Sequence, residues 1–146
     1  MSMSDSCFSK GHAIHEIGHA LGLWHEHSRP DRDEFIEVLY ENIRASEEDN
    51  FGKLTQEKFE LVPDVGYDIE SIMHYGPYAF SKDDGGPDKK TILLKDDAPL
   101  DYTNCTNLLA MGQRDELSYL DKLRVNKLYS CNGESISMYT NSYSFI

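Results

Sequence analysis

Residues 15–33 read HEIGHALGLWHEHSRPDRD, and this stretch decides the fold because it holds four of the six histidines in the chain. An apolar stripe recurs at helical spacing around its first part, at Ile14, Ile17 and Leu21. This spacing predicts a helix over residues 12–24, with Ser9 as its N-cap and Gly22 as its stop signal. The helix and the turn that follows it place the histidines relative to one another.

The spacing of His15 and His19 predicts a pair of metal ligands. Residues four apart lie about 40° apart around a helix and roughly 6 Å apart along it. The two imidazoles can therefore bind one zinc ion, whose nitrogen ligands lie at about 2.0–2.1 Å. His12 shares this face, but it lies roughly 10 Å along the axis from His19, so one ion cannot bind both. If His15 and His19 form the pair, His12 is a surface histidine.

His25 can join this pair only if the helix stops and the chain turns back. On a continued helix it would lie roughly 9 Å beyond His19 and point away from the pair. Gly22 permits the turn, because glycine reaches positive φ without a steric penalty. Three histidines leave a fourth zinc position for water, which is typical of catalytic sites. The spacing H-x-x-x-H-x-x-G-x-x-H therefore predicts one zinc ion per chain.

Glu16 follows the first histidine directly, so it projects about 100° away from His15 around the helix. Its carboxylate is then expected beside the ion, where it can accept a proton from a water molecule that zinc activates. This arrangement, extended by a third histidine and a methionine turn, is the metzincin pattern. The alternative is a cluster of surface histidines on an ordinary amphipathic helix, and the fixed offsets of Gly22 and His25 argue against it.

Outside this stretch, weaker signals predict the remaining elements. Strands are expected over residues 35–40 and 91–94, and a short helix over residues 51–61. A further helix is expected over residues 118–129, because Ser118 with Asp121 three residues later makes a start like a capping box. The mixture of helices and short strands indicates an α+β chain.

With SIMHYG at residues 71–76, the chain resembles the astacin family of zinc metalloendopeptidases. The matches YENI, NFGK and LSYLDKLRVNKLYSC, at residues 40–43, 50–53 and 117–131, extend the likeness over residues 7–131. The resemblance implies an α+β, metzincin-like zinc-peptidase fold over residues 1–131, with a zinc helix, a methionine turn and a C-terminal helix. Residues 132–146 are expected to form a polar tail.

The resemblance also implies roles for individual residues. The three histidine ligands of the zinc ion would be His15, His19 and His25. Tyr75 would be an additional ligand, which leaves the ion and donates a hydrogen bond to the oxyanion when substrate binds. Glu16 would be the catalytic base, and Met73 would form the methionine turn beneath the metal. The implied reaction is hydrolysis of peptide bonds in polypeptide substrates through a zinc-activated water.

Four residues near the site receive no chemical role from the resemblance. His27 and His74 are interpreted as bystanders, while Trp24 and Tyr78 are interpreted as packing residues. Glu26 is a different case, because in the family it would meet the processed N-terminus of the mature enzyme.

In the family, a substantial N-terminal half with a twisted sheet precedes the zinc helix, whereas only fourteen residues precede His15 here. We therefore expect the chain to lack most of that N-terminal sheet subdomain. The apolar stripe of the zinc helix would then be uncovered. Cys7 and Cys131 would lack their usual disulfide partners, and Cys105 has no counterpart in the pattern.

Composition restricts the partners and the location of the chain. With 14 basic and 26 acidic residues, the formal net charge is −12, which disfavours nucleic acid and anionic membranes as partners. No stretch approaches the roughly 20 apolar residues of a membrane-spanning helix, so no membrane insertion is expected. The polar N-terminus has no apolar signal region. Secretion is therefore implied by the family resemblance alone, and the oligomeric state is left open.

Two functional hypotheses remain open at this point. The first is a zinc-dependent metalloendopeptidase, of which this chain is all or part. The second is a catalytically inactive zinc-binding fragment of such an enzyme, from truncation or splicing. A different HExxH peptidase, with a glutamate as third ligand, conflicts with Gly22, His25 and residues 71–76. A longer transcript that encodes a signal peptide and upstream cysteines would favour the first hypothesis.

Overall fold

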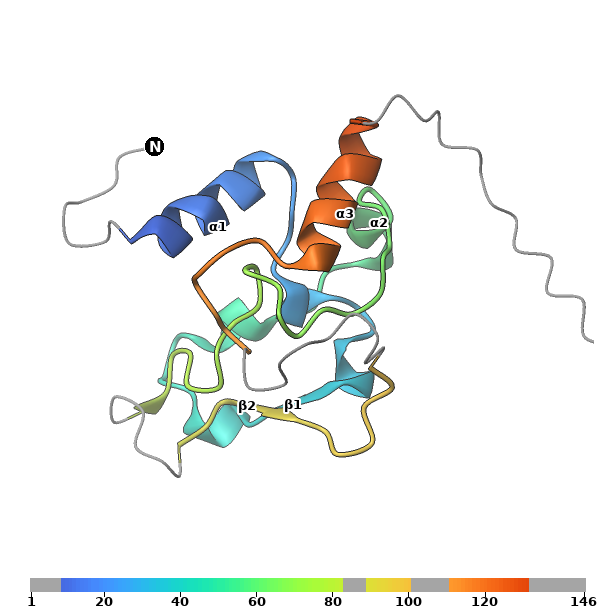
Figure 1. Ribbon diagram of the computed structural model, residues 1–146. Helices are drawn as coiled ribbons and strands as arrows, with labels where there is room; N and C mark the ends of the chain where they lie inside the picture. Colours follow the sequence, from blue (N-terminus) through green and yellow to red (C-terminus); the bar gives the residue numbers. More distant parts are fainter. Residues whose placement is uncertain (1–8, 83–88, 101–110, 132–146) are drawn as a thin grey trace, which may run out of the picture.

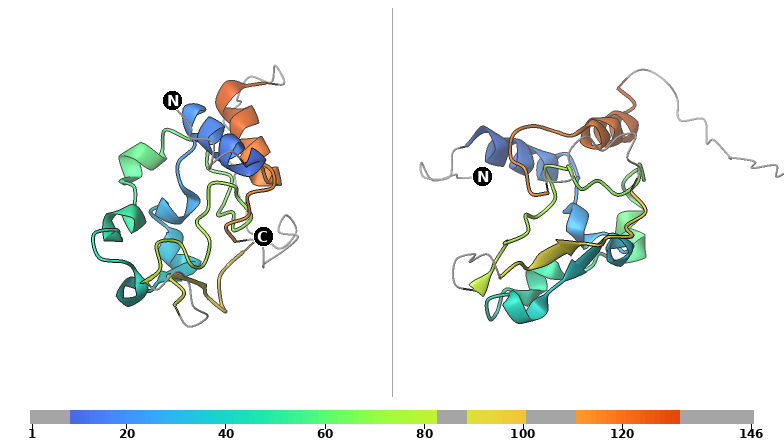
Figure 2. Two further views of the ribbon diagram at one scale, coloured as in Figure 1. Left: turned by 90° about the vertical axis from the view of Figure 1, so that its left-hand side faces the viewer. Right: turned by 60° about the horizontal axis from the view of Figure 1, so that its bottom comes forward.

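The computed structural model describes residues 9–82, 89–100 and 111–131. Within these ranges the helices are α1 (Lys10–Ala20), α2 (Gln56–Phe59) and α3 (Tyr119–Tyr129), and the strands are β1 (Ile36–Val38) and β2 (Ile92–Leu94). Helices α1 and α3 lie at one end of the molecule and the two strands at the other (Figures 1 and 2). The predicted α+β class is confirmed.

Helix α1 begins two residues earlier and ends four residues earlier than the predicted range 12–24. Ser9 is its N-cap, as predicted, since the Ser9 hydroxyl accepts a hydrogen bond from the backbone N–H of His12. The helix ends early because Gly22 takes a φ of +88°, which lets the Leu23 N–H bond back to the Gly18 carbonyl at 2.9 Å. The predicted glycine turn is therefore present.

The two sides of α1 have different surroundings. Gly11, His15 and Gly18 are buried along one side. A Cβ atom at Gly18 would lie 2.7 Å from the Met73 sulfur, so this glycine allows close approach of the helix to the chain beneath it. On the outer side, the Ile17 side chain is 57% exposed. Of the predicted uncovered stripe, only Ile17 is fully open, since Ile14 packs on a core cluster.

The strands β1 and β2 pair antiparallel, with Ile36 opposite Leu94 and Val38 opposite Ile92. Both predicted strands are thus present, although each is shorter than expected. Ile36 and Ile92 of these strands belong to the larger core cluster. Its buried members are Phe35, Ile36, Ile43, Phe51, Tyr67, Ile69, Ile92, Ala98 and Leu100. A smaller cluster of Leu23, Ile72 and Met73 lies against α1 and α3.

The predicted helix over residues 51–61 is wrong in extent. Gly52 is extended, with φ −61° and ψ 142°, so it separates a 3₁₀ turn at Glu48–Phe51 from the short helix α2. Thr55 then caps α2 by accepting a hydrogen bond from the Lys58 N–H.

The predicted capping box at the start of α3 is confirmed. The Ser118 hydroxyl accepts from the Asp121 N–H at 2.8 Å, and the Asp121 carboxylate accepts from the Ser118 N–H at 3.1 Å. Cys131, just beyond α3, is exposed, whereas Cys7, Cys105 and the predicted tail over residues 132–146 lie outside the described residues. None of the helices in the described ranges is long and apolar enough to cross a membrane.

Candidate metal centre

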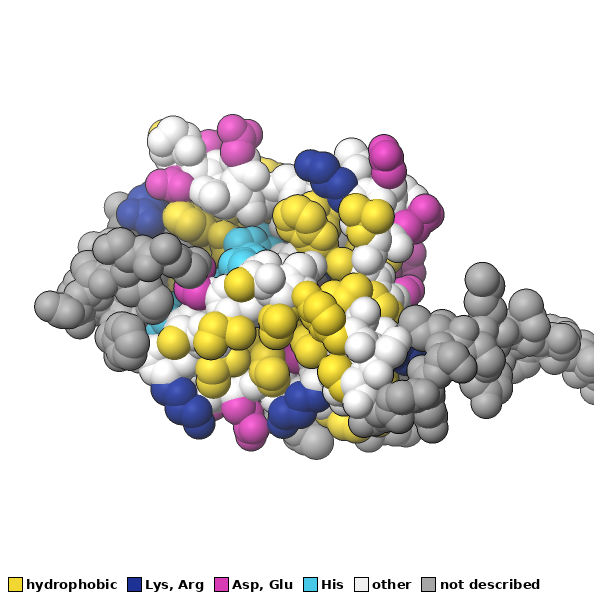
Figure 3. All heavy atoms as spheres, turned by 90° about the horizontal axis from the view of Figure 1, so that it is seen from above, with side chains coloured by type: hydrophobic (Ala, Val, Ile, Leu, Met, Phe, Trp, Pro, Cys, Tyr) yellow, Lys and Arg dark blue, Asp and Glu magenta, His cyan; other side chains and the backbone are white. Residues whose placement is uncertain are grey.

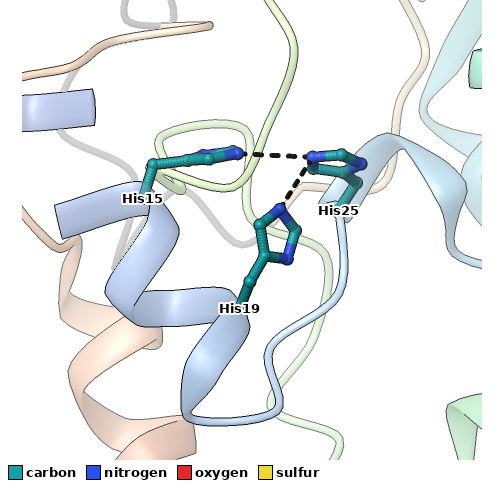
Figure 4. A group of neighbouring side chains, drawn as sticks. All are labelled: His15, His19 and His25. Atoms are coloured by element: carbon teal, nitrogen blue, oxygen red, sulfur yellow. Dashed lines mark hydrogen bonds between the residues drawn. The ribbon is translucent and has the colours of Figure 1, made fainter. Parts of the chain in front are cut away.

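Three histidine side chains converge at the end of α1 (Figure 4). The Nε2 atom of His25 lies 3.1 Å from Nε2 of His19 and 3.3 Å from Nε2 of His15. His15 and His19 project from successive turns of α1, and His25 approaches from the segment after the Gly22 turn. His12 is exposed and bonds to the Ser9 hydroxyl, so it takes no part in the group.

The second ring nitrogen of each α1 histidine is occupied by a backbone carbonyl. His15 donates from Nδ1 to the Ile72 carbonyl at 2.8 Å, and His19 donates from Nδ1 to the Leu23 carbonyl at 3.0 Å. A carbonyl can only accept, so each Nδ1 carries the ring proton in the neutral tautomer. Each Nε2 then presents a lone pair, which is the orientation that metal-binding histidines adopt.

These distances fit a zinc ion better than a hydrogen-bonded histidine cluster. Nitrogen ligands at about 2.05 Å in a tetrahedron lie about 3.3 Å apart, close to the two measured separations. The Nε2 atom of His25 can donate at most one proton, so it cannot satisfy the lone pairs of both His15 and His19. A single cation satisfies all three atoms, and the residues present therefore fit zinc.

Burial keeps the rings of His15 and His25 in the form that binds metal. It lowers the pKa of His15, and it lowers the pKa of His25 to about 3, with further lowering from the nearby His19. A neutral imidazole is the ligand that zinc requires. Seen from above Figure 1, histidine side chains are visible at the surface among hydrophobic ones (Figure 3). Two ligands of the centre, His19 and His25, are only partly buried, so the centre has access to the outside.

Glu16, the predicted base, lies on α1 directly after His15 and is half-buried. Burial is the main cause of the lowered pKa of His15, and the Glu16 carboxylate acts in the opposite direction by favouring the charged ring. The carboxylate is thus electrostatically coupled to the first histidine. Its role as the base stays a prediction.

Tyr75, the predicted additional ligand, lies next to the third histidine. Its ring centroid is 4.7 Å from that of His25 and 3.8 Å from that of His27. Burial raises the pKa of the Tyr75 phenol, so the hydroxyl keeps its proton at neutral pH. The structure therefore brings the three predicted histidine ligands together and places the Tyr75 ring beside one of them, His25.

The turn at residues 71–74 is fully buried under this centre. Met73 reaches Gly18 of α1, and its carbonyl accepts from the Glu26 N–H at 3.2 Å. Asp121 of α3 holds the turn, because its carboxylate accepts from the Ser71 hydroxyl at 2.7 Å and from the Ile72 N–H at 2.9 Å. Ile72 thus donates its N–H to Asp121 and accepts a hydrogen bond from His15 with its carbonyl.

A buried charge network adjoins the third histidine. The Glu26 carboxylate accepts from two nitrogens of Arg124 at 3.0 and 3.3 Å, from Arg29 at 3.4 Å and from the Asp68 N–H at 2.9 Å. The resemblance implies that Glu26 meets a processed N-terminus. In the described part of the chain, arginines from the Glu26 segment and from α3 surround it.

The interpretation of His27 and His74 as bystanders stays a prediction, and both side chains are fully buried. His27 stacks on Tyr75, and the Nε2 of His74 shares a 2.8 Å hydrogen bond with the Tyr67 hydroxyl. The packing interpretation of Trp24 and Tyr78 is wrong, since they are 43% and 39% exposed. Their apolar character alone suggested burial, whereas no periodic pattern supported it.

Asp121 and Arg124 are supporting residues that sequence reasoning missed. The capping-box pattern identified Asp121 as a helix residue, but its contacts with residues 71 and 72 span about 50 positions of the chain. Arg124 pairs with Glu26 across 98 positions. The sequence signal for both roles is weak, namely an ionisable residue on the inner face of α3.

Comparison with known proteins places these residues in a family context. The profile of the astacin peptidase family matches residues 1–130. The chain is 43% identical over 129 residues to zinc metalloproteinase nas-14 of Caenorhabditis elegans, covering 87% of this chain and 22% of that protein. It is 40% identical over 131 residues to astacin-like metalloprotease toxin 1 of Loxosceles intermedia, covering 90% of this chain and 46% of that protein.

A solved structure shows the same relationship. High choriolytic enzyme 1, a hatching enzyme zinc-protease from Oryzias latipes, matches with a TM-score of 0.65 and 35% sequence identity. The match covers 83% of this chain and 52% of that one. The chain thus spans about half of this solved structure, and 22% and 46% of the two curated relatives.

Proposed function

This chain belongs to the astacin family of zinc metallopeptidases, and we propose that it supplies the zinc-binding part of a metalloendopeptidase that hydrolyses peptide bonds in polypeptide substrates. The observation that carries the proposal is the convergence of three histidine Nε2 atoms, with that of His25 lying 3.1 and 3.3 Å from the other two. By family resemblance, we extend the proposal to an extracellular location.

The proposed ligands of one zinc ion per chain are His15, His19 and His25, with Tyr75 as the additional ligand. The ion, when bound, would supply Lewis-acid activation of a water molecule and of the scissile carbonyl. The carbonyls of Ile72 and Leu23 orient the two α1 rings, so the ligand set is prepared before the metal arrives.

The chain's own residues would then move the proton and hold the developing charge. Glu16 would take the proton from the attacking water and deliver it to the leaving amine. Tyr75 would donate a hydrogen bond to the carbonyl oxygen as it becomes negative. The raised pKa of the Tyr75 phenol supports this role, because the proton to be donated stays on the hydroxyl at neutral pH.

The test measures zinc content and casein cleavage in parallel on the whole chain. Wild type should hold about one zinc per chain and cleave casein. Glu16→Ala should keep the zinc and lose roughly 10²–10⁴-fold in rate, the usual contribution of a general base. His19→Ala should lose both zinc and cleavage.

The outcomes test separately the choice between the two functional hypotheses, the base and the metal centre. Zinc binding without cleavage by the wild type would support the inactive zinc-binding fragment. Equal cleavage by wild type and Glu16→Ala would refute Glu16 as the base. Equal zinc content in wild type and His19→Ala would refute the metal centre itself.

A further inference from the structure

We propose that His27 is a positioning residue, whose ring seats the phenol of Tyr75 beside the three metal-binding histidines. This inference rests on the proposed function, in which Tyr75 is the additional ligand. It gives a task to a buried histidine that the ligand set does not use.

The stack between His27 and Tyr75 is the closest ring contact that Tyr75 makes among the described residues. Their centroids are 3.8 Å apart and their planes differ by 25°. The other rings around Tyr75 lie farther away and at steeper angles, with 53° for His25, 81° for Phe51 and 49° for Phe80. Within the described ranges, His27 therefore supplies the one near-parallel face against which the phenol ring lies.

His27 is itself held rigidly in place. Its side chain is fully buried, and its Nε2 donates to the Asn50 carbonyl at 3.0 Å. Its backbone carbonyl accepts from Arg32 at 3.1 Å, and Phe51 meets its ring edge-on at 5.8 Å. These contacts fix both the position of the ring and the direction in which its plane faces.

A histidine here carries a cost that an ordinary aromatic residue would avoid. Its Nδ1 is buried and has no hydrogen-bond partner among the described residues. A phenylalanine would present the same flat face without this unpaired nitrogen. What phenylalanine lacks is the Nε2 bond to Asn50, which prevents the ring from rotating. The Nε2 bond to Asn50 therefore compensates for the unpaired nitrogen, because it holds in place the ring plane on which Tyr75 lies.

The consequence concerns how Tyr75 moves. With one face of its ring against His27, the phenol can leave the ligand position by sliding or swinging away from the stack, and it gains the stacking contact when it returns. Loss of the His27 ring should weaken the seated position relative to the displaced one. His15 and His19 should be unaffected, because the hydrogen bonds that orient their rings do not involve the His27 side chain. The His25 ring lies 5.3 Å from that of His27, centroid to centroid, so the copper affinity of each variant must be measured as well.

The test loads the whole chain with Cu²⁺ in place of zinc, because a phenolate on Cu²⁺ gives a visible charge-transfer band. Acetohydroxamate is then titrated in to displace the tyrosine, and its midpoint reports how firmly Tyr75 is seated. His27→Leu removes the ring at similar size, His27→Phe keeps a ring, and Tyr75→Phe identifies the band. Copper content near one per chain verifies that each variant is folded.

We expect the acetohydroxamate midpoint of His27→Leu to fall roughly two- to tenfold, the effect of losing one aromatic pair. His27→Phe should lie between wild type and His27→Leu, because it restores the flat ring but lacks the Nε2 bond to Asn50. If His27→Leu fails the copper check, His27→Gln removes the ring while keeping a donor for Asn50. An unchanged midpoint in the ringless variant would overturn the inference.

A different result would test the proposed function instead. If wild type and Tyr75→Phe have identical spectra, Tyr75 is not a ligand and that part of the proposed function fails. If His27→Leu binds copper less tightly than wild type with its band per copper unchanged, His27 acts through His25, and the positioning role for Tyr75 is refuted.

Discussion

Helix α1 and the turn at residues 71–74 meet at the same centre, but they are built in opposite ways. The helix carries two proposed ligands and the proposed base, yet its outer side faces solvent, with Ile17 57% exposed. Every residue of the turn is fully buried. The turn carries no proposed ligand, and it is held by α3 through the Asp121 carboxylate.

The difference teaches that the chemical groups and their alignment come from separate parts of the chain. The Ile72 carbonyl orients His15, and the Met73 carbonyl binds the residue after His25. The turn therefore contacts both ends of the ligand set. Changes in the turn should affect stability and zinc affinity together, whereas changes on the outer side of α1 should affect neither.

The largest effect is expected for Asp121→Ala. The change leaves the Ser71 hydroxyl and the Ile72 N–H buried without their acceptor, so the free energy of unfolding should fall by about 3 kcal/mol or more. Zinc affinity should fall roughly 10- to 100-fold, because the carbonyl that orients His15 loses its support. Urea unfolding and chelator competition measure the two quantities.

Ser118→Ala is the matched control for this change. It removes the capping hydroxyl of α3, and with it the hydrogen bond to the Asp68 carboxylate, but leaves the Asp121 contacts with the turn in place. A loss of about 1 kcal/mol with unchanged zinc affinity is expected, as for other N-cap substitutions. Equal effects of the two variants on zinc affinity would show that the helix cap, rather than the turn, supports the ligands.

The next effect tests the contact between helix and turn. Gly18→Ala improves helix propensity, but the added Cβ would lie 2.7 Å from the sulfur of the fully buried Met73. Overpacking of this kind costs about 1–3 kcal/mol, which outweighs the propensity gain of about 1 kcal/mol. Thermal unfolding should show a net loss. Stabilisation instead would mean that Met73 can move aside freely and that the turn is looser than its burial suggests.

Asp68, just before the turn, links the same region to pH. Burial raises the pKa of its carboxyl from 3.8 to about 7, and the charges of Asp121 and Glu26 add to the rise. Because the folded-state pKa is the higher one, this group stabilises the fold fully below about pH 4 and loses that contribution as pH rises through about 7. Asp68→Asn should remove this slope, of the order of 1 kcal/mol per pH unit, in urea unfolding between about pH 5 and 7. A slope equal to that of wild type would contradict it.

The smallest effect is expected on the outer side of α1. Ile17→Ser replaces a side chain that is 57% exposed, so stability should change by no more than about 0.5 kcal/mol, with zinc affinity unchanged. Unfolding and chelator competition measured beside Asp121→Ala give the comparison directly. A loss as large as that of Gly18→Ala would show that this side is covered in solution.

The parts of the centre that could be predicted from sequence are those set by short-range geometry. His15 and His19 lie four residues apart on one helix, and Gly22 needs only its own backbone freedom to turn the chain toward His25. The alignment of the rings could not be predicted in this way, because it depends on carbonyls and carboxylates far along the chain. Asp121 is an example, since its capping role is local and its contact with Ile72 is not.

The elements of the fold show the same difference between local and long-range causes. The capping box at Ser118 and the strands around Ile36 and Ile92 follow from local patterns, and they were predicted. The interruption at Gly52 could not be predicted for the helix over residues 51–61, because the chain just after this glycine makes a distant contact: the Leu54 N–H donates to the Ser28 carbonyl at 2.7 Å. The burial of His27 has the same origin, since its environment is assembled by residues 50, 51 and 75.

The wedging of Met73 beneath α1 has a consequence for oxidation chemistry. Peroxide converts a thioether to a sulfoxide by adding an oxygen atom, and the sulfur of Met73 is fully buried against Gly18. Met111, which is half-buried, should react first. Sulfoxide formation at Met73 then requires α1 to separate from the turn. Its rate, measured from peptide masses, therefore reports how often the metal centre opens, and the measurement needs no substrate.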